Sequence, residues 1–77
     1  MLIGSTERRR WESERRYYAA LLHQDLLGDW VIDVQWGGKY NRLGGRETIA
    51  VPSLEAGQAQ LLDIHRERLA RRYSSIE

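Results

Sequence analysis

Apolar and polar residues alternate most regularly in the segment 30–36, and this alternation predicts a β-strand. Trp, Ile, Val and Trp occupy every second position, whereas Asp33 and Gln35 fall on intervening positions. Because successive side chains of a strand point to opposite faces, the four apolar residues share one face. β-branched and aromatic residues are typical of half-buried strands. We therefore expect one face of this segment to cover a hydrophobic core.

The run at 16–24, RYYAALLHQ, is predicted to be a strand that pairs with this one. Its apolar content alone also fits a helix. The next five residues, Asp25 to Asp29, favour a strand, because they form a turn in which Gly28 is available for a positive φ. A second apolar run follows directly, so the two runs are expected to form a β-hairpin.

The segment from Gly37 to Gly45 is predicted to be a loop, because its four glycines and one asparagine disfavour regular structure. A third strand is expected from Arg46 to Val51, with its apolar part in the last four residues. Pro52 ends this strand, since proline has no N–H to donate to a sheet.

A C-terminal helix is predicted after Ser53, which can cap it, with Glu55 in the first turn, where the helix dipole favours negative charge. Gly57 costs up to about 1 kcal/mol of helix stability relative to Ala, and we expect it to let the helix approach the sheet closely. Apolar positions recur at spacings of three and four. They are Leu54, Leu61, Leu62, Ile64, Leu69 and, as an additional core-lining candidate, His65. The last turns carry Arg66, Arg68, Arg71 and Arg72, either as ordinary helix-end charge or as part of a basic surface.

The 77 residues fit one small domain. Residues 1–15 are charged and irregular and are expected to form a flexible N-terminal arm, with a short helix as the alternative. Trp11 is the residue of this arm that can pack onto the domain. Residues 16–73 are expected to form the domain itself, and residues 74–77 a C-terminal tail.

The composition indicates the cellular compartment in which the protein is expected to occur. The chain has no cysteine, so it forms no disulfide framework, which fits a reducing compartment. The apolar run at the start of the chain is too short for the core of a signal peptide. No apolar run approaches the roughly 20 residues of a membrane span. We expect a soluble cytoplasmic protein that does not contact a membrane.

The formal net charge is only +1, but the charges are unevenly distributed along the chain. No acidic residue occurs between Asp33 and Glu47, and this window contains Lys39, Arg42 and Arg46. Segregated charges can produce a strong local field even when the whole chain is nearly neutral.

The segment 36–46 is the main candidate for binding, because it combines three cations, two aromatic rings and four glycines. Cations neutralise phosphates, rings stack on sugars or bases, and glycines let backbone N–H groups approach a phosphate. The alternative is that Trp36 covers the core and the rest is a solvated loop, in which case Tyr40 is the better candidate for an exposed ring. The predicted nucleic-acid-binding residues are Trp36, Gly37, Gly38, Lys39, Tyr40, Arg42 and Arg46.

No catalytic or metal site is expected. The chain offers no cysteine nucleophile, and His23 and His65 are its only histidines. Two isolated histidines without close ligand spacing are more often structural or surface residues than metal ligands. We therefore expect no enzyme activity, no cofactor and no metal.

The order of motifs from Tyr17 to Tyr73 resembles the WGR family, the module found in poly(ADP-ribose) polymerases and in many small bacterial proteins. The matching pieces are Tyr17-Tyr18, the hairpin turn through Trp30, Trp36-Gly37, the glycine-rich loop, the third strand and the helix ending in Arg71-Arg72-Tyr73. The resemblance implies an α+β fold, in which a small twisted antiparallel sheet of three to five strands has one C-terminal helix packed on a face.

The resemblance also implies a nucleic-acid-binding role, in which Trp36 packs against a sugar at a DNA end. The third position of the Trp-Gly-Arg signature is Gly38 here, so the contact that the family makes through that arginine has no counterpart at this position. Lys39 and Arg42 are the nearest cations, and neither has the same geometry.

Two function hypotheses follow. The first is a free-standing, non-catalytic nucleic-acid-binding module, with DNA the expected partner, that grips the sugar–phosphate backbone through the loop after Trp36. The second is a protein-interaction or homo-oligomeric module in which the same Trp and Tyr anchor a protein. The first hypothesis requires Trp36 and the loop cations to lie together.

Overall fold

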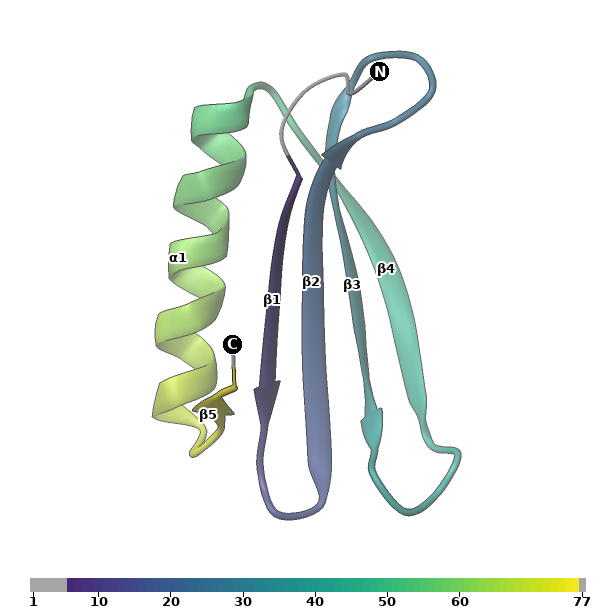
Figure 1. The fold of residues 1–77 in the computed structure, drawn as a ribbon, viewed down its shortest axis with the longest axis vertical. Coiled ribbons are helices and arrows are strands. Elements are labelled where there is room, and N and C mark those ends of the chain that lie inside the picture. The colour runs from purple at the N-terminus through teal and green to yellow at the C-terminus, as the bar shows by residue number, and fades with distance from the viewer. Residues whose placement is uncertain (1–5, 77) are drawn as a thin grey trace.

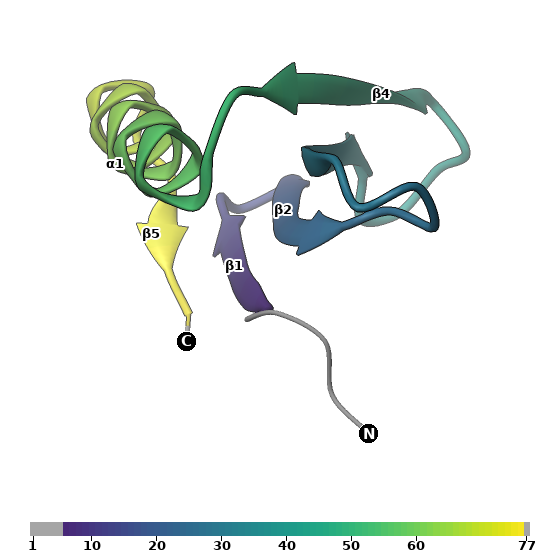
Figure 2. The ribbon, with the colours of Figure 1, turned by 90° about the horizontal axis from the view of Figure 1, so that it is seen from above.

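Five antiparallel strands and one helix make up the fold of residues 6–76, which are the residues that the computed structural model describes (Figure 1). In chain order the elements are β1 (Glu7–Glu12), β2 (Arg16–Gln24), β3 (Trp30–Gly38), β4 (Gly44–Val51), α1 (Leu54–Ala70) and β5 (Ser74–Ser75). The strands form one open sheet in the order β4-β3-β2-β1-β5. Helix α1 lies on one side of this sheet only (Figure 2). The predicted α+β fold is therefore confirmed.

The hairpin of β2 and β3 forms where the alternating pattern predicts it. Leu22 pairs with Ile32 in the register of this hairpin, and both side chains are fully buried. The turn is closed by Asp25, whose side chain accepts hydrogen bonds from the N–H groups of Leu27 (2.9 Å) and Asp29 (3.0 Å). Gly28 has the positive φ, 87°, expected from the sequence.

The prediction of a flexible N-terminal arm is wrong for residues 7–12, which form strand β1 and pair with β2. Trp11 from this strand has no exposed surface and lies in the centre of the core. Its indole N–H donates to Nδ1 of His65 on the helix, at 3.1 Å. The strand escapes sequence reasoning because its surroundings are charged and only one core residue marks it. The part of the predicted arm at residues 1–5 lies outside the described residues.

The predicted C-terminal tail also contains a short strand. Ser74 and Ser75 pair with the end of β1, and the N–H of Ile76 donates to the carbonyl of Arg10 at 3.1 Å. The pairing exists only because β1 is present to receive it, so the local sequence carries no signal for it. Residue 77 is outside the described chain.

The glycine-rich segment is more regular than predicted. Strand β3 continues to Gly38 and β4 begins at Gly44, so only residues 39–43 form the loop. Gly37 pairs with Gly44, and Gly45 pairs with Trp36. A Cβ at Gly45 would lie 2.8 Å from the Trp36 indole, which shows that glycine leaves the space that the ring occupies. These glycines serve strand pairing and packing.

The helix packs against the sheet through a narrow stripe. Ser53 caps α1 by accepting a hydrogen bond from the N–H of Ala56 at 3.0 Å. Gly57 is buried directly against Leu22, so the expected close approach of helix and sheet is confirmed. Leu62 and Leu69, two of the predicted apolar positions, are about half exposed. The buried core consists of Trp11, Ala20, Leu22, Ile32, Val34, Leu61 and Ile64.

A hydrogen-bonded reversal ends the helix. The N–H of Tyr73 donates to the carbonyl of Arg68, and the N–H of Arg72 donates to that of Leu69, both at 3.0 Å. This is the Schellman arrangement, which requires a residue in the left-handed conformation just after the C-cap. Here that residue is Arg72, with φ 68°, although glycine is the residue that adopts this conformation without strain.

We expect Arg72→Gly to raise the free energy of unfolding by about 0.5–1 kcal/mol, because glycine removes the clash of Cβ with the backbone. Urea unfolding followed by circular dichroism measures the change. Arg71→Gly is the matched control, since Arg71 has φ −95° and gains nothing from glycine. A stability of Arg72→Gly at or below that of the wild type would contradict backbone strain at Arg72.

Candidate nucleic-acid interface

Trp36 lies near the end of β3, on the same face of the sheet as the helix. Its indole stacks on the ring of Tyr18, the residue opposite it on β2, with ring centroids 6.2 Å apart and planes 14° from parallel. The side chain nevertheless keeps 37% of its surface exposed. Trp36 therefore combines the two roles considered from the sequence, because part of its ring supports the core and part remains open to a ligand.

A wide cleft of about 710 Å³ opens beside this indole. Its cations come from the start of β2 and the end of α1, and its rings come from β2, β3 and the segment after the helix. The charged and aromatic lining residues are Arg16, Tyr18, Trp36, Glu47, Arg68, Arg71 and Tyr73, and the others are Ser13, Gly37, Leu43 and Gly44. We call this site the aromatic–arginine cleft.

Arg68 forms the inner wall of the aromatic–arginine cleft and is only 9% exposed. Its guanidinium lies 4.3 Å from the centre of the Tyr18 ring and 5.3 Å from that of Tyr73. One of its terminal nitrogens donates to the Glu67 carboxylate at 3.1 Å, whereas its Nε is buried without a hydrogen-bond partner among the described residues. Two aromatic rings thus hold a cation that is incompletely satisfied by hydrogen bonds.

The burial of the inner wall of the aromatic–arginine cleft also changes the pKa of Tyr18. Desolvation raises the pKa of its phenol, although the nearby Arg68 cation acts in the opposite direction. The sequence contains one signal for the buried arginine. Arg68 follows Ile64 by four residues and Leu61 by seven, so it falls on the buried stripe of the helix.

The structure places the predicted site residues in three different surroundings. Trp36 and Gly37 belong to the aromatic–arginine cleft. Lys39 instead makes an ion pair with Glu12 at 3.0 Å, and its N–H donates to the carbonyl of Arg15 at 2.8 Å. This pair joins the two loops at the lower end of the sheet, and the Lys39 side chain lowers the pKa of the Glu12 carboxyl.

Tyr40 and Arg42 are exposed in the loop, with 79% of the Tyr40 surface accessible. Gly38 lies at the end of β3, and its N–H donates to the carbonyl of Leu43 at 2.9 Å. That N–H group is therefore engaged within the protein and is not directed at a ligand. Leu43 of this loop lines the aromatic–arginine cleft, whereas Tyr40 lines a separate hollow.

Arg46 lies on the other face of the sheet. In the register of β3 and β4, Gly45 is the partner of Trp36 and Arg46 is the partner of Gln35. Since side chains alternate between faces, Trp36 and Arg46 point to opposite sides. The structure therefore does not bring the three loop cations and Trp36 together. The reason is that strand geometry continues through residues that the sequence assigns to a flexible loop.

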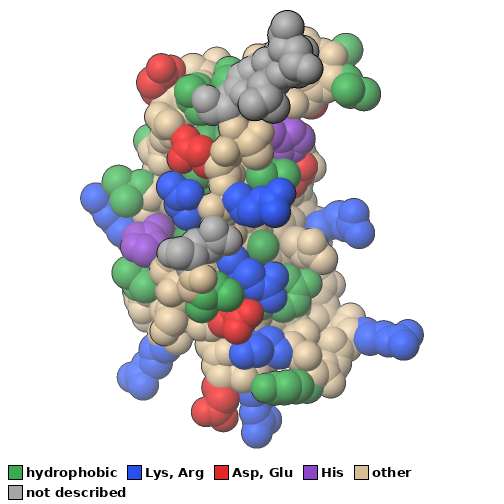
Figure 3. Space-filling model, viewed as in Figure 1, with side chains coloured by type: hydrophobic (Ala, Val, Ile, Leu, Met, Phe, Trp, Pro, Cys, Tyr) green, Lys and Arg blue, Asp and Glu red, His purple; other side chains and the backbone are tan. Residues whose placement is uncertain are grey.

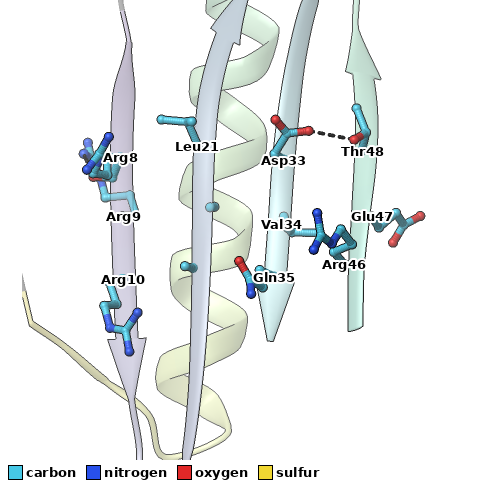
Figure 4. Close-up of a pocket in the computed structure, with 12 residues that line it drawn as sticks. Arg8, Arg9, Arg10, Leu21, Asp33, Val34, Gln35, Arg46, Glu47 and Thr48 are labelled. Atoms are coloured by element: carbon cyan, nitrogen blue, oxygen red, sulfur yellow. Dashed lines mark hydrogen bonds between the residues drawn. The ribbon is translucent and has the colours of Figure 1, made fainter. Parts of the chain in front are cut away.

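The face turned away from α1 carries a second group of cations. Arg10 on β1 and Arg46 on β4 lie on either side of the two central strands, with Gln35 between them (Figure 4). In the space-filling view, Lys and Arg side chains are spread over the strands with hydrophobic side chains between them (Figure 3). This face is distinct from the aromatic–arginine cleft.

A hydrogen-bonded chain crosses three strands on this open face. Nε2 of His23 lies 2.6 Å from Asp33, and the Thr48 hydroxyl donates to the same carboxylate at 2.6 Å. The bond to Asp33 raises the pKa of His23 above its ordinary value of 6.5. The bonds from Thr48 and His23 lower the pKa of Asp33.

Across residues 6–76, no three His, Asp or Glu side chains gather closely enough to hold a metal ion. Helix α1 lacks the length and apolar character that crossing a membrane requires, and it is the only helix in that range.

Comparison with known proteins found no matching family model, no similar curated protein and no similar solved structure.

The His23–Asp33 pair predicts a pH dependence of stability. The pKa of His23 is raised in the folded state. Its ion pair with Asp33 therefore contributes fully to the free energy of unfolding below about pH 6.5, and this contribution is lost as the pH rises through the folded-state pKa. The free energy of unfolding should therefore fall as the pH rises above about 6.5. His23→Gln should flatten this dependence, and urea unfolding at several pH values measures it. Both proteins retain His65, so an unchanged pH dependence in the variant would exclude His23 as the cause.

Proposed function

We propose that this chain is a non-catalytic nucleic-acid-binding module that contacts the sugar–phosphate backbone at the aromatic–arginine cleft. The observation that carries the proposal is the half-exposed Trp36 indole, stacked on Tyr18 and flanked by arginines from two other elements. A flat ring packs on a sugar or base, and neighbouring guanidinium groups bind phosphates. The presence of rings and cations within one cleft suits a backbone that alternates sugar and phosphate.

The arginines of the aromatic–arginine cleft divide into two kinds. Arg16 and Arg71 are exposed and can reach a phosphate directly. Arg68 is buried between rings, so it contributes its positive field more than a flexible contact. A fixed cation in a poorly solvated position attracts an anion more strongly than one in bulk water. Arg16 and Arg71 thus provide the phosphate contacts that the loop cations Lys39 and Arg46 do not provide here, and Arg68 strengthens the positive field around them.

The resemblance to the WGR family supports the same proposal. It implies that Trp36 packs against a sugar at a DNA end, and Trp36 is the ring that remains open in the cleft. The absence of arginine at Gly38 is compatible with this role, because Arg16 and Arg71 bring guanidinium groups to the same cleft from β2 and α1. Tyr40 and Arg42, exposed in the adjacent loop, extend the contact along the backbone.

One observation favours a protein partner at the same place. Leu43 lines the aromatic–arginine cleft and is 77% exposed, next to the exposed Tyr40. Aliphatic and aromatic side chains that are exposed together often anchor a protein interface. The two functions differ in their response to salt, since phosphate contacts release counterions and apolar contacts do not.

We expect binding of a labelled short blunt DNA duplex to weaken about 5- to 150-fold in Trp36→Ala, because stacking of one aromatic ring contributes about 1–3 kcal/mol. Fluorescence anisotropy measures the affinity, and single-stranded DNA of the same sequence tests the preference for duplex. Trp36→Phe keeps a ring on Tyr18 and should retain most of the affinity. Circular dichroism establishes that both variants are folded.

Salt dependence tests the arginines independently. If Arg16 and Arg71 contact phosphate and Arg68 adds its field, log K should fall against log salt with a slope of about −2 to −3. Arg71→Gln should make the slope shallower by nearly one, whereas Arg66→Gln should leave it unchanged, because Arg66 is exposed on the same helix outside the cleft. Affinity that is independent of salt, or equal in both variants, would exclude the phosphate contacts.

A further inference from the structure

We propose that this chain associates with a second copy of itself by docking the β2–β3 turn of one copy onto the open sheet face of the other. The turn comprises residues 25–29 and is called the hairpin tip. The receiving surface is the hollow on the face opposite α1. Its lining includes Arg8, Arg10, Ala19, Leu21, Gln35 and Arg46, together with the carboxylates of Asp33 and Glu47, and it is called the open-face hollow.

The hairpin tip exposes two large aliphatic side chains on a rigid support. Leu26 is fully exposed and Leu27 retains 86% of its accessible surface. Asp25 fixes the turn through its two side-chain hydrogen bonds, and Gln24 adds a third by donating to the carbonyl of Gly28 at 2.9 Å. Polar residues would form the same turn equally well, because its geometry depends on Asp25 and Gly28. The two leucines therefore have no role in the turn itself.

Acidic side chains flank these leucines. Asp25 precedes them and Asp29 follows them, so the hairpin tip is an apolar pair between two negative charges. A rigid turn loses little conformational entropy when it binds, which favours association by such a segment. A complementary surface would have an apolar floor to contact the leucines and positively charged residues at its rim to pair with the carboxylates.

The open-face hollow has this character. Ala19 and Leu21 of β2 form part of its floor and are both partly exposed. The strand register aligns Arg10, Ala19, Gln35 and Arg46 in one row across four strands. The row thus begins and ends with arginine and has short or uncharged side chains between them. The volume, about 570 Å³, falls within the roughly 300–1,000 Å³ of sites that enclose small ligands.

The charges of the rim are largely available. Arg8 and Arg46 make no side-chain hydrogen bond or ion pair within residues 6–76. Arg10 is held by Glu12 at 3.1 Å and by stacking over Tyr17. Arg8 and Arg46, on opposite edges of this floor, match two carboxylates on either side of an apolar pair. The Asp33 carboxylate within the hollow is already engaged by His23 and Thr48.

The apolar floor distinguishes a protein segment from a nucleic acid. A phosphodiester backbone would use the arginines but would leave Leu21 and Ala19 without a partner. The hairpin tip provides partners for the apolar floor and for the arginines, because its leucines cover the floor while Asp25 and Asp29 pair with the arginines of the rim. The tip cannot reach the hollow of its own chain, since about five residues of extended strand, roughly 17 Å, separate them. A hairpin tip that binds the hollow therefore comes from a second copy of the chain.

The contact joins two different surfaces. Two copies can exchange tips reciprocally and close as a dimer, or each copy can bind the next in a chain. In either arrangement the aromatic–arginine cleft stays open, because Trp36 lies on the opposite face from the hollow. Self-association and nucleic-acid binding are therefore independent properties, and one can fail without the other.

Sedimentation equilibrium of the wild type over a range of protein concentrations should show reversible self-association. Leu26→Ser with Leu27→Ser removes the apolar tip, and Arg8→Glu with Arg46→Glu reverses the rim. Each double variant alone should dissociate at least about tenfold more readily, as expected when a central apolar or charged contact is lost. An equimolar mixture of the two should form a 1:1 complex, because the first variant keeps an intact hollow and the second an intact tip.

The matched control is Leu62→Ser with Leu69→Ser, which removes two half-exposed leucines from α1 instead. This variant should associate like the wild type. Because all the substituted side chains are at the surface, circular dichroism is expected to show native folding for each variant. A wild type that stays monomeric, a tip variant that associates as well as the wild type, or a mixture that forms no complex would each overturn the proposal. A rim variant that loses only DNA binding would assign the hollow to nucleic acid and overturn it as well.

Discussion

The burial of Trp11 is the contact on which the rest of the structure depends. Its indole fills the space between sheet and helix and donates a hydrogen bond to His65. The same ring lies 6.0 Å from the ring of Tyr18, and Tyr18 stacks in turn on Trp36. A line of three rings therefore connects the centre of the core to the half-exposed indole of the candidate interface. In a domain this small, such a core residue also carries a large share of the total stability.

This arrangement explains how a thin core can position a binding surface. The tilted ring of Trp11 packs against Tyr18, and the Arg68 guanidinium lies over the face of the Tyr18 ring. Trp36 therefore stacks on a ring that cannot turn away. A ligand that packs on the open part of Trp36 would meet a surface already in place, which reduces the entropic cost of binding. The reversal of the chain at the end of α1 places Tyr73 in the same cleft.

The two faces of the sheet offer two different chemistries. The helix-side face ends in rings and arginines, which suit a sugar–phosphate backbone. The open face combines an apolar floor with a charged rim, which suits a protein turn. Strand alternation separates them, because neighbouring residues such as Gly45 and Arg46 belong to opposite faces. One short chain can thus carry two independent contacts without their competing for the same residues.

Local patterns in the sequence determined the hairpin, the third strand and the capped helix, because alternation, turn chemistry and helical spacing act within a few residues. The same patterns identified Trp36 as a candidate ligand-binding ring and Gly57 as a site where the helix approaches the sheet closely. Tertiary structure alone decided the rest. Strand β1 exists because Trp11 completes a core formed by distant residues, and β5 exists because β1 offers an edge to pair with. Arg68 lies between Tyr18 and Tyr73, and Lys39 is paired with Glu12, because segments far apart in the chain meet there. No local pattern encodes such meetings, since they depend on how the whole sheet closes against its helix.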